Sequence, residues 1–129
     1  MISIIRFNYL YRDGSNFKSW GEVFFSNPDE LDIKIIDKRL RAAFEQEAHF
    51  IAHQISIPEI FLYNKGNLNY ADHCFHEYDS IEVIESPNID THKLTLKQFF
   101  ELAEKISASG WNAFDPIDEL PHIQQRLAQ

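Results

Sequence analysis

The sequence predicts one α+β domain, residues 1–129, in which helices pack on one face of a mainly antiparallel sheet. Alternating apolar and polar residues around a turn-rich segment near the N-terminus indicate a β-hairpin. Later segments carry apolar residues at helical spacing, and strand and helix signals are mixed along the chain. A chain of this length also suits a single hydrophobic core. The predicted order is β-β-α-β-β-α, followed by a short C-terminal helix.

The N-terminal hairpin is predicted by period-two patterning. Residues 2–12 alternate apolar with polar side chains, which is typical of a half-buried strand. The turn-forming residues 13–16 follow, and residues 20–25 form a second apolar run. Pairing across this turn would place Tyr11 near Trp20, where a cross-strand aromatic pair fixes the register.

A helix is predicted after the hairpin. Asn27 is expected to cap it, Pro28 to occupy its first turn, and Glu30 to complete a capping box. Apolar residues at helical spacing then run from Ile33 to Phe44. We expect this helix to end between residues 44 and 49.

Further strands are predicted in the middle of the chain. Residues 49–57 alternate, which favours a strand that Pro58 ends or confines to a sheet edge. Residues 60–63 form a short apolar run and are expected to be another strand. Residues 80–85 predict a strand with Ile81 and Val83 pointing inward.

Two helices are predicted near the C-terminus. Thr95 and Gln98 form a capping box before an apolar stripe at helical spacing, and Gly110 is placed as a C-cap. Asp115 and Pro116 then announce a short terminal helix.

Charge and composition narrow the classes of function. Twelve basic against 20 acidic residues give a formal net charge of −8, which disfavours nucleic-acid binding and favours a basic protein partner. The same acidity also keeps a small protein soluble. No apolar stretch has the length of a membrane span, and the N-terminus lacks a signal-peptide pattern. A single cysteine excludes an internal disulfide, so we expect a cytoplasmic protein.

The densest group of chemically capable side chains is the run from residue 72 to residue 79. His73, Cys74, His76 and Glu77 are ligand types for a divalent transition metal, and no other cofactor is expected. On a strand, however, His73 and His76 would point to opposite faces because they are three residues apart. The other interpretation of the run is a polar strand edge with a buried cysteine.

The histidines and the cysteine could also support other chemistry. Cys74 with His76 could act as nucleophile and base, although a free cysteine is more often a small core residue. His49 and His53 could share a metal if the first helix extended that far, but the alternation there favours a strand. The spacing matches no known catalytic signature, so no catalytic residue is assigned.

Aromatic residues next to predicted loops and strand ends point to a partner surface. They are Phe17, Trp20, Tyr63, Tyr70, Phe75, Tyr78 and Trp111. An exposed subset would mark a protein partner or a homodimer contact, whereas the alternative is that the core needs large side chains. We expect Arg12, Trp20 and Tyr78 to contact the partner. Arg6 is expected to pair with a carboxylate on the neighbouring strand.

Residues 9–21 (YLYRDGSNFKSWG), together with the run from residue 72 to residue 79, resemble a family of short bacterial proteins with no assigned activity. That resemblance implies a bacterial, cytoplasmic protein and brings no catalytic residues. The sequence leads to the hypothesis of a non-enzymatic protein-binding module, such as an immunity-type inhibitor or an accessory subunit. The alternative is a metal-binding protein or metal-dependent enzyme that uses the run.

Overall fold

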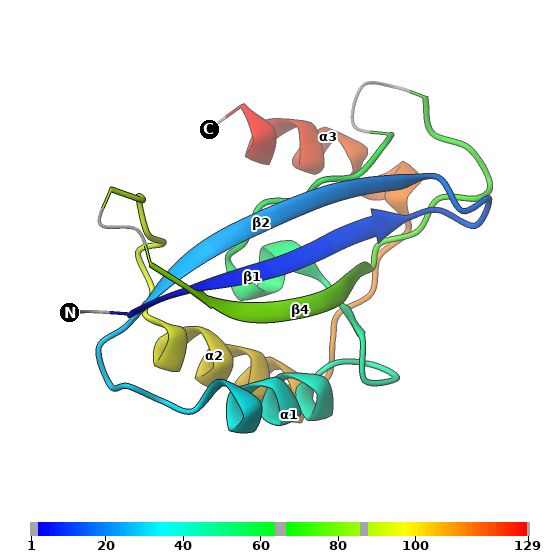
Figure 1. Cartoon of the computed structure of the whole chain (residues 1–129). Coiled ribbons are helices and arrows are strands. Elements are labelled where there is room, and N and C mark those ends of the chain that lie inside the picture. Colours follow the sequence, from blue (N-terminus) through cyan, green and yellow to red (C-terminus); the bar gives the residue numbers. More distant parts are fainter. Residues whose placement is uncertain (1–2, 64–66, 86–87, 129) are drawn as a thin grey trace.

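The computed structural model describes residues 3–63, 67–85 and 88–128, and it confirms the predicted α+β class. A four-stranded antiparallel sheet has the order β2-β1-β4-β3. Its strands are β1 (Ser3–Arg12), β2 (Lys18–Asn27), β3 (His49–Phe50) and β4 (His76–Ile84). The helices are α1 (Ile33–Ala43), a short 3₁₀ helix η1 (Ala52–Ile55), α2 (Leu96–Ser109) and α3 (Pro116–Leu127). Figure 1 shows α1 and α2 side by side below the sheet, and α3 above β2 on the side away from them.

The hairpin is present, but its register differs from the predicted one. Leu10 lies opposite Trp20, and Tyr11 lies opposite Ser19. The turn sets this register, because the Asp13 carboxylate accepts hydrogen bonds from the backbone N–H groups of Ser15 and Phe17, both at 2.9 Å. The shift of one position moves Trp20 to the sheet face opposite Tyr11.

The predicted start of α1 was wrong. Asp32, not Asn27, caps the helix, and its Oδ1 accepts from the backbone N–H of Lys34 at 2.8 Å. The Asn27 side chain instead exchanges two hydrogen bonds with the backbone of Leu31, both at 3.1 Å. Glu30 has a φ of 52°, which no right-handed helix accommodates. Residues 27–31 are therefore a separate turn before the helix.

The middle of the chain forms fewer strands than predicted. β3 has two residues, η1 follows it after Ile51, and residues 60–63 are not a strand. Ser56 adopts the left-handed conformation at the end of η1, with a φ of 64°. Phe50, Ile51 and Ala52 are consecutive and all buried, so this segment turns through the core instead of alternating.

β4 begins four positions before the predicted strand and contains a β-bulge. Tyr9 lies opposite Tyr78, whereas its neighbour Asn8 lies opposite Ser80. Asp79 is therefore the extra residue on β4.

The C-terminal predictions are confirmed. The Thr95 side chain and Gln98 form the capping box of α2, and Gly110 follows its end with a φ of 95°. Asp115 caps α3, and Pro116 occupies its first turn. Pro121 lies within α3. None of the described helices is long and apolar enough to span a membrane.

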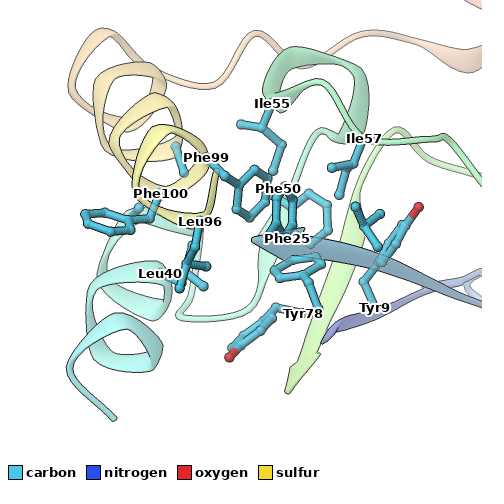
Figure 2. Packing of buried hydrophobic residues seen from close by; sticks show 14 of the residues in the cluster. Tyr9, Phe25, Leu40, Phe50, Ile55, Ile57, Tyr78, Leu96, Phe99 and Phe100 are labelled. Carbon is cyan, nitrogen blue, oxygen red and sulfur yellow. The ribbon is translucent and has the colours of Figure 1, made fainter. Parts of the chain in front are cut away.

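The main core lies between the inner face of the sheet and the helices α1 and α2 (Figure 2). Phe7 is fully buried at its centre, and its ring lies 5.1 Å from that of Phe99 and 5.3 Å from that of Tyr78. A second cluster joins β1 to α3, and its buried members are Tyr11, Phe61, Tyr63 and Ile123. The opposite face of the sheet carries Arg6 and Asn8 of β1 with Trp20 and Glu22 of β2, and it is called the open face below.

Candidate functional site

The run of residues 72–79 crosses the boundary between a loop and β4, so its members separate. His73 lies in the loop, and both of its ring nitrogens have backbone partners. Its Nε2 lies 2.7 Å from the carbonyl oxygen of Arg12, and its Nδ1 accepts from the backbone N–H of Phe75 at 3.0 Å. A carbonyl can only accept, so Nε2 carries the proton and His73 serves the fold of this loop.

His76 and Cys74 are both buried. The His76 ring is fully buried, and its Nε2 accepts from the backbone N–H of Ile60 at 2.9 Å. Burial lowers the pKa of His76 to about 3. Burial also raises the pKa of the Cys74 thiol, which keeps it in the less reactive protonated form.

Glu77 points to the open face, away from His76. Its carboxylate forms two contacts with the Arg12 guanidinium, both 3.2 Å, and lies 3.9 Å from Nε2 of His49. Among the described residues, no group of three or more His, Cys, Asp or Glu side chains is placed to hold a metal ion. The four predicted ligands, His73, Cys74, His76 and Glu77, therefore do not converge in this arrangement.

The three predicted partner residues have different environments. Trp20 is 61% exposed on the open face. Arg12 is engaged by Glu77 and also donates to the Asn16 side chain at 2.6 Å. Tyr78 is a core residue: it is buried, and its hydroxyl donates to the Asp37 carboxylate at 2.5 Å. It therefore lies out of reach of a docking partner. Arg6 pairs with Glu82 on β4, as predicted.

A hollow lies where the loop of residues 68–75 faces the start of α3. It has a volume of about 840 Å³, and we call it the α3 groove. Its apolar lining consists of Leu68, Tyr70, Cys74, Phe75, Ala113, Phe114, Pro116 and Ile117. Tyr70 is 100% exposed and Ile117 is 68% exposed, so two large apolar side chains lack cover at its edge.

The polar side chains of the α3 groove are neutral or negative. They are Asn69, Asp72, His73 and Asp115. Asp72 is fixed by Tyr11, whose hydroxyl donates to it at 2.7 Å, and Asp115 caps α3. The groove is lined by no lysine or arginine among the described residues, and the acidic first turn of α3 follows Asp115 directly.

Sequence reasoning missed the α3 side of this groove. In the sequence, Asp115 and Pro116 indicate only a helix start, and Ile117 carries no signal that separates it from ordinary helix residues. On the other side of the groove, Tyr70 and Phe75 are among the aromatic residues that the sequence predicted for a partner surface. Only the packing of α3 on the second cluster brings the two segments together.

No protein-family model matches the chain, and neither the curated proteins nor the solved structures contain a significant match to it.

Proposed function

We propose that this protein is a non-enzymatic protein-binding module, such as an immunity-type inhibitor or an accessory subunit. Its α3 groove would hold a segment of a protein partner that carries an apolar side chain flanked by lysine or arginine. The observation that carries the proposal is a groove with exposed apolar side chains and carboxylates, whose lining includes no basic side chain from the described part of the chain.

The apolar part of the groove would supply most of the binding free energy. Tyr70 and Ile117 are exposed on its rim, and Phe75 and Phe114 are partly buried beneath. Large aromatic and aliphatic side chains around a concave surface are typical of the residues that dominate protein interfaces. A partner side chain seated here would remove them from water without changing the fold.

The charges would select the sign of the partner. Asp72 and Asp115 line the groove, and the whole chain carries a formal net charge of −8. Such a field accelerates the approach of a basic protein. It repels an acidic protein and also a nucleic-acid backbone. A basic flank on the bound segment would meet both carboxylates.

The hydrogen bonds and the burial of the reactive side chains favour binding over catalysis. His73 has backbone partners at both ring nitrogens, and Cys74 is buried with a raised pKa. A metal-dependent enzyme built on residues 72–79 has less support, because the predicted ligands point in different directions. A bacterial, cytoplasmic setting stays a prediction from the sequence.

A defined peptide tests the proposal directly. The peptide Arg-Arg-Leu-Arg-Arg, blocked at both ends, would be titrated into the ¹⁵N-labelled full chain and followed by amide chemical shifts. We expect saturable shifts centred on Tyr70, Phe75 and Ile117, weakened by salt because charges contribute. The matched peptides Glu-Glu-Leu-Glu-Glu and Arg-Arg-Gly-Arg-Arg separate the charge requirement from the apolar one.

Three variants sharpen the result. Ile117→Ser should abolish the saturable shifts, whereas Phe17→Ser, at an equally exposed residue outside the groove, should leave them unchanged. Asp115→Asn keeps a good helix cap while it removes the charge, so it should weaken binding and reduce its salt dependence. Shifts spread evenly over the acidic surface, or equal binding of the glutamate peptide, would contradict the proposal.

A further inference from the structure

Strand β2 lies at one edge of the sheet. Among the described residues, β2 pairs with β1 and with no other strand. The first backbone hydrogen bond of this ladder, next to the turn, joins the N–H of Asp13 to the carbonyl of Phe17. Alternation along an antiparallel ladder then directs the backbone groups of the even-numbered residues of β2 away from β1. The carbonyl of Phe24 confirms this direction, since it accepts from the backbone N–H of His92 at 2.7 Å.

The segment around His92 thus forms a backbone hydrogen bond with β2 at Phe24, but it does not cover residues 18–22. The outward backbone groups of Lys18, Trp20 and Glu22 have no partner strand among the described residues. An open edge of this kind is a template for another strand. The side chains of these same residues lie on the open face, where Trp20 is 61% exposed.

We propose that a second copy of this chain pairs with residues 18–22 of β2, antiparallel, about a two-fold axis at Trp20. Trp20 then lies opposite Trp20 of the second copy. Lys18 lies opposite Glu22 of the second copy, and the symmetry repeats that pair on the other side of the axis. The two sheets become one continuous sheet.

Two observations favour this register over registers shifted by one or two residues: the charges that face each other, and the backbone groups that the described residues leave unpaired. A shift of the axis to Glu22 would place two carboxylates directly opposite each other, which destabilises an antiparallel pair. An axis at Gly21 would place Lys18 opposite Phe24, whose carbonyl is already occupied by His92. Only the axis at Trp20 combines opposite charges with free backbone groups.

The side chains on this edge are free to make the new contacts. Glu22 is half exposed, and its nearest cation is Arg6 at 3.8 Å. Lys18 is exposed. The net charge of −8 on each copy opposes association, so the dimer forms at high protein concentration and dissociates on dilution.

Sedimentation equilibrium of the full chain over a wide concentration range tests the register through charge reversal. We expect the wild type to dimerise, and Lys18→Glu and Glu22→Lys each to raise the dissociation constant at least about tenfold, because like charges then face each other. The double variant Lys18→Glu/Glu22→Lys restores opposite charges and should return to within about threefold of the wild type. Trp20 and Glu22 amides should exchange hydrogen more slowly as the concentration rises.

Lys105→Glu and Glu47→Lys make the same charge changes at exposed positions outside β2 and serve as controls. If one of the single variants at β2 fails to fold, the other carries the same comparison. The proposal is overturned by a wild type that stays monomeric at every concentration. It is equally overturned by single variants that dimerise like the wild type, or by a double variant as monomeric as the single ones.

Discussion

The buried histidine of β4 should make this protein lose stability in mild acid. The His76 ring is enclosed by aromatic rings, the nearest being Phe61 with 4.5 Å between centroids. Its Nε2 accepts from Ile60, so the proton of the neutral ring lies on Nδ1, which has no hydrogen-bond partner among the described residues. A second proton could enter only at Nε2, where it would face the N–H of Ile60 and break that hydrogen bond.

The magnitude follows from proton linkage. Burial lowers the pKa of His76 from 6.5 to about 3, so the folded protein keeps it neutral while the unfolded chain takes up a proton below pH 6.5. The stability that depends on neutral His76 is fully present above pH 6.5 and is lost progressively as the pH falls towards 3. Between about pH 7.5 and about pH 5.5, the free energy of unfolding should fall by about 1.4 kcal/mol from this group alone.

Urea unfolding followed by circular dichroism at the two pH values measures this loss. The variant His76→Gln retains an acceptor for the N–H of Ile60 but cannot titrate, so it subtracts the contribution of every other group. We expect the variant to lose about 1.4 kcal/mol less than the wild type over this interval, whatever its absolute stability. Equal losses in the two proteins would refute the reasoning. Glu59 does not confuse the comparison, since its pKa lies below the usual 4.5.

Two other predictions concern buried groups. Arg126 holds the buried Glu59 carboxylate through hydrogen bonds of 2.5 and 2.8 Å, so Arg126→Met should lower the free energy of unfolding at neutral pH by about 2 kcal/mol. Urea unfolding measures it, with Lys105→Met as control; a loss below about 0.5 kcal/mol would contradict the prediction. Cys74 is 3% exposed and its pKa is raised by burial, so Ellman's reagent should label it at least about 100-fold more slowly in buffer than in urea. Comparable rates would show that the thiol is accessible in the folded protein.

The elements that the sequence predicted well are those fixed by neighbours along the chain. The capping box of Thr95 and Gln98, and the start of α3 at Asp115, depend on residues within one helical turn. The hairpin depends on a short turn and on alternation. Its register was missed because the Asp13 carboxylate organises a longer turn than residues 13–16 suggest.

The misassigned elements depend on contacts between distant segments. Residues 49–57 alternate in sequence. Phe50, Ile51 and Ala52 are nevertheless all buried, because the chain turns inside the core there. Alternation therefore does not indicate a strand at these positions. The α3 groove is of the same kind, because residues 68–75 and 113–117 meet only through tertiary packing. The concentration of histidine, cysteine and carboxylate in residues 72–79 did not place those side chains together in space.

The bulge at Asp79 explains why that run disperses and still fits the sheet. Before the bulge, the even-numbered His76 and Tyr78 point into the core; after it, the odd-numbered Ile81 does so, opposite Phe7. A regular strand in the register of Tyr78 would instead turn Glu82 inward and Ile81 outward. The one extra residue therefore lets even-numbered residues face the core before the bulge and odd-numbered residues face it afterwards. It places a histidine in the core and lets Glu82 reach Arg6 on the open face.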